Sequence, residues 1–200
     1  RHWEIALRTY AGIQIDQISR VDALRAIGCP DRPLAALSAA IPSLVTDPTA
    51  LQPAQEHGLS AAEIGQLQSL VPRLQRACDE LAGYGIPASL EHGDFYAWQI
   101  LIAEERPVFI DWSDCSIAPP FFSLLLFFAY GEMERHLPAV PRMHARLRDA
   151  YLEPWTAFAP MERLRAAFDL AQGVAPLHHA LIYQQQVLPN LEDPSEWEAM

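Results

Sequence analysis

The chain has 200 residues, half of them hydrophobic, and its 25 acidic and 14 basic residues give a net charge of −11. This size and apolar content suit a single domain with a sizeable core, and the acidic charge argues against nucleic acids and anionic membrane surfaces as partners. The longest apolar run is about half the roughly 20 residues of a membrane span, and the three cysteines form no Cys-x-x-Cys pair, which indicates a reducing, cytoplasmic compartment.

The first part of the chain is predicted to be helical. Apolar residues recur at helical spacing over Trp3–Gln14, Asp16–Ile27 and Leu34–Val45, and Gly28 ends the second of these stretches. The segment Asp47–Gly58 contains two prolines, so we expect a loop there.

A long amphipathic helix is predicted to follow. Ser60 and Glu63 have the spacing of a capping box, in which the serine side chain closes the start of the helix and the glutamate reaches back to it. One apolar stripe runs from Ile64 to Leu81 and keeps its phase across Pro72, which is expected to kink this helix without ending it.

The only sheet that the sequence predicts lies within residues 86–112. Ile100–Ile102 and Val108–Ile110 are short apolar runs rich in β-branched residues, and Glu104–Pro107 is the expected turn between them. These three segments predict one β-hairpin.

The remainder of the chain is predicted to be helical again, over Phe121–His136, Pro138–Phe158 and Met161–Leu188. We therefore expect a mainly α (α+β) fold, in which one small hairpin carries the chemistry. The last of these helices contains His178 and His179, whose side chains would point about 100° apart. We expect one of them to be packed and the other solvated, and not a metal-binding pair.

Two aspartates flank the predicted hairpin. Asp94 lies in a loop before it and Asp111 at the end of its second strand, so both carboxylates would come to one end. One carboxylate could then take a proton or orient a hydroxyl, while the other holds a divalent cation. The alternative for each aspartate alone is a turn or a helix cap, and a cap is the favoured interpretation of the nearby Asp114.

The segment from Leu90 to Ile102 contains His-Gly-Asp-x-x-x-x-Gln before an apolar run, and Ile110–Trp112 reads Ile-Asp-Trp. These motifs resemble the catalytic core of the aminoglycoside phosphotransferase family, a branch of the kinase-like superfamily. The resemblance implies that residues 1–200 form the helical C-terminal lobe of the protein-kinase-like fold, with the catalytic loop and metal-binding segment at 90–114. It also implies Mg²⁺-dependent transfer of the γ-phosphoryl group of ATP or GTP to the hydroxyl of a small molecule.

The resemblance assigns roles to five positions. Asp94 would be the catalytic-loop aspartate that faces the substrate hydroxyl, and Asp111 would be the main magnesium ligand. Gln99 would replace a metal-binding asparagine, with its amide oxygen moved by one methylene. His92 would support the loop by packing and hydrogen bonding. Ser123 stands where the family usually has an aspartate that accepts hydrogen bonds from the loop backbone, and a serine would hold the loop less firmly.

The chain contains no lysine, although a kinase-like enzyme uses a strand lysine to hold the nucleotide phosphates. We therefore expect the nucleotide-binding small lobe to be missing upstream of Arg1, and this chain alone to transfer little phosphate. A non-catalytic kinase-like binding protein is the first alternative, and a metal-dependent phosphohydrolase that uses Asp94, Asp111 and a histidine is the second. The acidic charge mildly favours a cationic acceptor.

Overall fold

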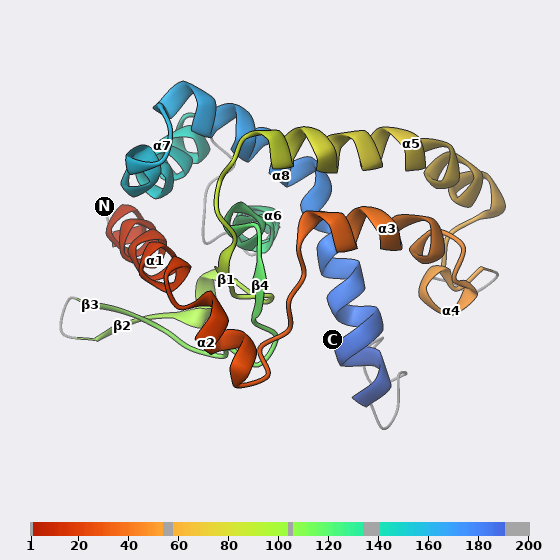
Figure 1. Ribbon diagram of the computed structural model, residues 1–200, viewed down its shortest axis with the longest axis horizontal. Helices are drawn as coiled ribbons and strands as arrows, with labels where there is room; N and C mark the ends of the chain where they lie inside the picture. The colour runs from red at the N-terminus through yellow and green to blue at the C-terminus, as the bar shows by residue number, and fades with distance from the viewer. Residues whose placement is uncertain (1, 54–57, 104–105, 134–140, 191–200) are drawn as a thin grey trace.

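The computed structural model of the protein describes residues 2–53, 58–103, 106–133 and 141–190 (Figure 1). The fold is mainly helical with a few short antiparallel strands, as expected. The α-helices are α1 (His2–Ile18), α2 (Val21–Ala26), α3 (Leu34–Leu44), α4 (Pro48–Leu51), α5 (Ala61–Gly83), α6 (Leu124–Met133), α7 (Pro141–Leu152) and α8 (Met161–Ile182). The strands are β1 (Ser89–Glu91), β2 (Ile100–Ala103), β3 (Arg106–Phe109) and β4 (Ser116–Ala118). Short turns of other helical types are η1 (Ala97–Gln99), η2 (Pro120–Ser123), η3 (Pro154–Ala157), η4 (Tyr183–Val187) and η5 (Leu188–Asn190).

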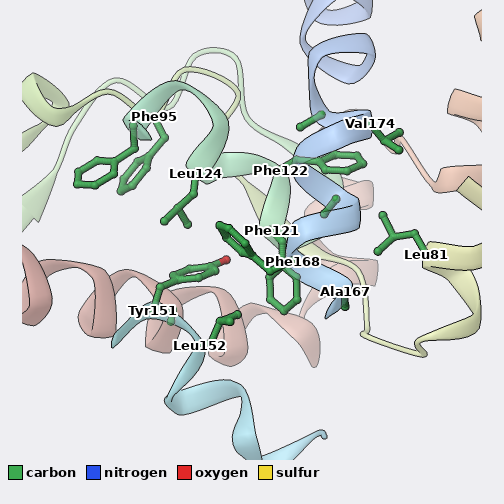
Figure 2. Close-up of a cluster of buried hydrophobic side chains, with 14 of the residues drawn as sticks. Leu81, Phe95, Phe121, Phe122, Leu124, Tyr151, Leu152, Ala167, Phe168 and Val174 are labelled. Atoms are coloured by element: carbon green, nitrogen blue, oxygen red, sulfur yellow. The ribbon is translucent and has the colours of Figure 1, made fainter. Parts of the chain in front are cut away.

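The long helix α8 lies at the centre of the fold and contacts α3, α5, α6 and α7 (Figure 1). Its inward face is apolar, and Leu164, Phe168 and Val174 are buried there. Phe121 of η2 lies between this face and α7, with ring centroids 6.0 Å from Phe168 and 5.8 Å from Tyr151 (Figure 2). Buried aromatic side chains contribute large apolar areas, so this cluster fixes η2 directly behind the segment that carries the predicted site.

Helix α5 begins as predicted. Oγ of Ser60 accepts from the backbone N–H of Glu63 at 3.3 Å, and the glutamate carboxylate accepts from the backbone N–H of Ser60 at 2.8 Å. Pro72 lies inside the helix, which continues to Gly83 as the apolar stripe predicts.

The predicted hairpin is confirmed, since β2 and β3 pair antiparallel with Ile100 opposite Phe109. Arg106 and Pro107 were expected in its turn, but they belong to β3, because pairing continues past the apolar run and places Ala103 opposite Arg106. A proline is tolerated there because β3 is an edge strand of a two-stranded sheet. Glu104 and Glu105 lie outside the described residues.

The prediction that residues 86–112 hold the only sheet was wrong. Strand β1 pairs antiparallel with β4, and Leu90 lies opposite Ile117. Ile117 also forms a parallel bridge with Asp31 in the loop between α2 and α3. Every residue of β4 is buried and the strand has three residues, so it shows no alternation of apolar and polar side chains by which a strand could be recognised.

Other element boundaries differ from the predicted ones. The stretch Asp16–Ile27 is divided, because α1 runs on to Ile18 before α2 begins. The expected loop after α3 contains α4, which starts where a carboxylate oxygen of Asp47 accepts from the backbone N–H of Thr49 at 2.9 Å. The helix expected from Phe121 begins as the 3₁₀ turn η2, and the last helix ends in the π-helical turn η4.

The last two predicted helices are described in part. Helix α7 covers residues 141–152 of Pro138–Phe158 and is followed by η3, while 138–140 lie outside the described residues, as do 134–136 of the preceding prediction. Among the described helices, none combines the length and the apolar character that crossing a bilayer requires.

Candidate active site

The side-chain amide of Gln99 lies between the two predicted site aspartates. Its Nε2 donates to Oδ2 of Asp94 at 3.3 Å and to Oδ2 of Asp111 at 3.2 Å. The two carboxylates therefore face one point in space and lie no farther apart than two such hydrogen bonds placed end to end. The structure thus brings together the three residues to which the sequence assigned catalysis and metal binding.

The hairpin places Gln99 beside Asp111. Gln99 ends η1 and its carbonyl accepts from the backbone N–H of Ile110 at 3.1 Å, so the hairpin pairing extends to the residue before the aspartate. Asp111 has a backbone φ of +63°, in the left-handed region that aspartate enters more readily than most residues. Oγ of Ser113 donates to Oδ1 of Asp111 at 3.0 Å. Uncommon backbone conformations of this kind cluster at functional sites.

His92 connects the two segments that carry the aspartates. Its Nε2 lies 3.0 Å from the carbonyl oxygen of Ile110, and its Nδ1 accepts from the backbone N–H of Asp94 at 3.3 Å. A carbonyl can only accept, so Nε2 carries the proton and the ring is neutral. Burial lowers the pKa of His92 despite nearby carboxylates, which favours this neutral form. These contacts suit the supporting role that the sequence suggests for His92.

Gly93 allows the loop to approach the segment after Asp111. Its φ is +83°, and a Cβ added to it would lie 2.2 Å from the carbonyl oxygen of Asp114. Any other residue would therefore clash with backbone and also adopt an unfavourable conformation. The glycine of the His-Gly-Asp motif thus fixes the spacing between the two aspartate-bearing segments.

The buried carboxylate of Glu91 holds the loop that carries Asp94 by hydrogen bonds. Its Oε1 accepts from the backbone N–H of Gly93 and from Oγ of Ser123, both at 3.0 Å, and its Oε2 accepts from Nε2 of His178 at 3.1 Å. Burial by itself would raise the pKa of Glu91, but the hydrogen bond and charge of His178 and the other two donors bring it below its usual range. Glu91 is therefore ionised in the folded protein and fully hydrogen-bonded.

Ser123 belongs to a wider network of buried hydrogen bonds that joins α1 to the loop. Its Oγ accepts from the hydroxyl of Tyr10 at 2.7 Å and lies 3.4 Å from the backbone N–H of His92. Gln14, one turn further along α1, donates to the carbonyls of Leu90 at 3.0 Å and of Pro120 at 3.1 Å. Satisfied buried networks of this kind rigidify their surroundings, so the predicted weakness of a serine at position 123 is offset by neighbouring groups.

The environment of Asp94 raises the pKa of its carboxyl group. Burial is the main cause that brings the pKa of Asp94 to about 6, while the hydrogen bond from Gln99 opposes the shift and the charges of Asp114, Asp111 and Glu91 add to it. A carboxylate with this pKa is ionised at neutral pH and yet basic enough to take a proton, which is the range in which general bases operate.

The donor set fits a magnesium ion that arrives with a nucleotide. Proteins bind Mg²⁺ through one or two carboxylates together with waters and substrate phosphates. Asp111 is exposed and Asp94 is partly exposed, and an N–H group already lies between their oxygens. A half-turn of the Gln99 amide would exchange Nε2 for Oε1, an oxygen of the kind that hard cations prefer. Within the described residues, no three His, Cys, Asp or Glu side chains are grouped so that they could hold a metal alone.

A groove of about 750 Å³ opens beside this site, and Ser113 lines it. Its walls come from α2 and the loop after it, from the segment after Asp111, and from η4. The charged side chain in this lining is Arg32, whose guanidinium donates to Oε1 of Gln185 at 3.1 Å and to Oε1 of Gln186 at 3.0 Å. The groove therefore combines apolar walls with amide groups and one cation.

The turn η4 connects this groove to distant parts of the fold. Gln184 donates to a carboxylate oxygen of Asp47 at the start of α4. Gln186 accepts from Arg32 and donates to the carbonyl of Ser113 at 3.1 Å. Three successive glutamines thus contact three separate segments, and π-helical turns are frequent at functional sites.

Sequence reasoning missed Glu91, His178 and Gln14 as parts of the site. Each is a polar residue at a position that packs inward, and Gln14 follows Tyr10 by four residues on the apolar face of α1. A buried polar residue needs a partner, so a polar side chain on an apolar stripe was the signal available for Gln14 and His178. Glu91 lies in a strand too short to show a stripe, so it gave no such signal.

Two further expectations were wrong. His179 was expected to be solvated when His178 is packed, but its Nε2 is buried and has no hydrogen-bond partner among the described residues. Asp114 was expected to cap a helix, but the element that follows it is β4, and Pro119 precedes the next helical turn. Trp98 is exposed and stacks on Tyr96, with the ring centroids 4.2 Å apart.

Comparison with known proteins gives one match. Residues 16–166 match the phosphotransferase enzyme family APH, whereas no curated protein and no solved structure matches the chain. The matched part is most of the chain and includes Asp94, Gln99 and Asp111. The chain therefore belongs to the APH phosphotransferase family, with the helical lobe of a kinase-like fold and a phosphotransferase-like function.

Proposed function

We propose that the protein is part of a small-molecule phosphotransferase that moves the γ-phosphoryl group of ATP or GTP to a substrate hydroxyl. The observation that carries this proposal is the convergence of Asp94 and Asp111 on the amide of Gln99. Phosphoryl transfer depends mainly on positioning and on charge stabilisation, so few protein groups are needed.

Asp94 is the proposed base. It would accept a hydrogen bond from the acceptor hydroxyl and take its proton as the phosphoryl group is transferred, and its pKa of about 6 suits that task. Asp111, together with Oε1 of Gln99 after the amide turns, would hold Mg²⁺. The ion would offset negative charge on the β- and γ-phosphates.

One exposed apolar face of the hairpin is the proposed place for the nucleotide base, beside Asp111. Leu101 and Val108 lie opposite each other in the β2–β3 pair, and Ile110 follows on the same face. Their exposed fractions are 49%, 43% and 37%, which is high for adjacent large apolar side chains. An apolar face next to a proposed metal ligand suits a planar purine base.

The groove lined by Arg32 and Gln186 is the proposed acceptor site, because its wall includes Ser113, which is bonded to Asp111. The net charge of the chain mildly favours a cationic acceptor. The local lining favours a neutral or anionic one, since its charged side chain is an arginine. The arginine charge acts at contact distance, whereas distant charges are screened by salt, so we propose a neutral or anionic acceptor.

A non-catalytic binding protein is the second candidate, and two observations favour it. The chain has no lysine to hold nucleotide phosphates, and the Gln99 amide already pairs with both carboxylates. The phosphohydrolase alternative requires a metal held by protein side chains and gains no support from the described residues.

The test is thermal melting with millimolar ATP or GTP, with and without MgCl₂. We expect the nucleotide to raise the melting temperature only when magnesium is present, because binding to the folded state stabilises it. Asp111→Ala should abolish the shift, whereas Asp79→Ala, at an exposed position on α5, should preserve it. A shift that is independent of magnesium, or that survives Asp111→Ala, contradicts the proposed phosphate chemistry.

A further inference from the structure

Two of the three cysteines meet in the wall of the groove. Cys29 and Cys115 lie close enough for each thiol to affect the pKa of the other, and both side chains are free and partly exposed. Both also line the groove beside the candidate active site. The third cysteine, Cys78, is buried in α5.

The backbone explains why the two thiols are adjacent. Asp31 and Ile117 form a parallel bridge, and two backbone hydrogen bonds of 2.8 Å fix its register. Cys29 and Cys115 each lie two residues before this bridge, so the bridge holds the two segments that carry them side by side. Neighbouring strands are about 4.8 Å apart, which lies within the roughly 4.4–6.8 Å between Cα atoms that a disulfide needs.

We propose that Cys29 and Cys115 are an oxidative modification site, at which a peroxide converts the two thiols into a disulfide. One sulfur attacks the O–O bond of hydrogen peroxide, and the resulting sulfenic acid forms as water leaves. The second sulfur then attacks the first, the S–S bond forms, and a second water leaves. Two thiols and one peroxide thus give one disulfide and two waters, with two electrons passing from sulfur to oxygen.

This bond would act on the neighbourhood of the candidate active site. It would tie the loop after α2, which contains Cys29 and Arg32, to the segment in which Cys115 follows Asp111 by four residues. The segment that carries the proposed metal ligand would then have less freedom to move. The disulfide would also draw together the part of the groove wall that contains Cys29 and Cys115, which are free cysteines in the structure.

The environment of the thiols sets the conditions for the reaction. Burial raises the pKa of Cys115 to about 11 and also raises the pKa of Cys29. The thiolate is the reactive form, so oxidation is slow near neutral pH and is measured at pH 8.5. The disulfide should persist under oxidising conditions and revert with a dithiol reductant.

The experiment oxidises the protein with a small excess of hydrogen peroxide and counts free thiols after denaturation. We expect the count to fall from the three cysteines of the chain to one, and to return to three with dithiothreitol. Peptide mapping should find Cys29 joined to Cys115. The oxidised protein should melt roughly 5–15 °C higher, as a cross-link that closes a long loop predicts.

Serine variants of the three cysteines distinguish a disulfide between Cys29 and Cys115 from other oxidation products. Cys78→Ser should still form the disulfide and lose both remaining thiols. Cys29→Ser and Cys115→Ser should form no disulfide within the chain. The proposal is overturned if the wild type keeps three thiols, if Cys78 is part of the main disulfide, or if the products are chiefly disulfide-linked dimers or sulfinic acids.

Discussion

Glu91 and His178 form a buried pair, in which Nε2 of the histidine donates to Oε2 of the glutamate at 3.1 Å. The glutamate belongs to the short strand β1 and the histidine to the central helix α8. The same carboxylate accepts from the backbone N–H of Gly93, so the pair links the central helix to the loop that carries Asp94. The carboxylate that holds this loop thus comes from β1, and not from position 123, where the family usually has an aspartate.

Moving the carboxylate from position 91 to position 123 should restore part of the stability that is lost when Glu91 is removed. We expect Glu91→Leu to lower the free energy of unfolding by about 3–5 kcal/mol, because it leaves His178 buried without its partner. Ser123→Asp alone should also destabilise, since it places a second carboxylate beside Glu91. Urea unfolding of the double variant should give a higher free energy than Glu91→Leu, because a carboxylate again faces the loop backbone.

The size of the compensation is measured by a double-mutant cycle. Residues in one hydrogen-bond network typically couple by about 0.5–3 kcal/mol. If the two changes add with no coupling, then Glu91 does not stand in for an aspartate at position 123.

Substitution of two glycines with positive φ should distinguish the cost of backbone strain from the cost of a steric clash. Gly85 has a φ of +69° with open space around it, whereas a Cβ on Gly93 would meet the backbone of Asp114. We expect Gly85→Ala to cost about 1–2 kcal/mol, the strain of a left-handed residue. Gly93→Ala should cost about 3 kcal/mol or more and abolish the magnesium-dependent nucleotide shift. Equal costs in chemical denaturation would show that the approach to Asp114 is not tight.

Asp94 should destabilise the folded protein at neutral pH. Its folded-state pKa of about 6 lies above the unfolded value of about 3.9. The folded state therefore binds the proton more tightly, and stability from this group is present below pH 4 and is lost as the pH rises through 6. Asp94→Asn removes this loss, so we expect it to melt higher than the wild type at pH 7.5.

The gain for Asp94→Asn is on the order of 1 kcal/mol after allowance for solvent screening of this partly exposed group, or about 2–4 °C. It should disappear at about pH 4, where the wild-type carboxyl becomes protonated in both states. Asp79→Asn makes the same chemical change at an exposed position on α5 and serves as the control. An equal gain at pH 4 and pH 7.5 would exclude ionisation as its cause.

The two faces of the hairpin should differ in nucleotide binding. Leu101 lies on the proposed nucleotide face, and Ile102 is its neighbour on the opposite face; their exposed fractions are 49% and 51%. Leu101→Asp should weaken the magnesium-dependent nucleotide shift at least tenfold in ligand concentration, because it places an anion beside the base and the phosphates. Ile102→Asp should leave the shift unchanged, and equal effects would place the nucleotide elsewhere.

Phosphate transfer by these 200 residues alone should be slow. All 14 basic residues are arginines, and the phosphate-holding lysine of a kinase-like enzyme has no counterpart among them. We expect little transfer of labelled phosphate from ATP to hydroxylated acceptors in the groove. Efficient turnover, lost in Asp94→Asn, would show that an arginine replaces that lysine.

Local patterns predicted the elements whose stability is local. The capping box of Ser60 and Glu63 and the hairpin from Ile100 to Phe109 depend on residues close in sequence, and both are confirmed. Strand β4 depends on β1 and on the loop before α3, both distant in the chain, so its three residues carried no sign of their pairing. Propensity and periodicity describe neighbours along the chain, and tertiary contacts override them elsewhere.

The candidate site shows the same division. Asp94 and Asp111 come together as their spacing suggested, and Gln99, whose place the family resemblance implied, lies between them. The supporting shell draws Gln14 from α1 and His178 from α8, so its members become neighbours only when the whole core is assembled.

The three glutamines of η4 make the end of α8 sensitive to chain length. Together they contact three segments of the chain, so a single inserted or deleted residue between His178 and Gln184 would rotate all three by about 100° at once. Asp47, Arg32 and Ser113 would then lose their partners together. This stretch should accept many changes of side chain but no change in its number of residues.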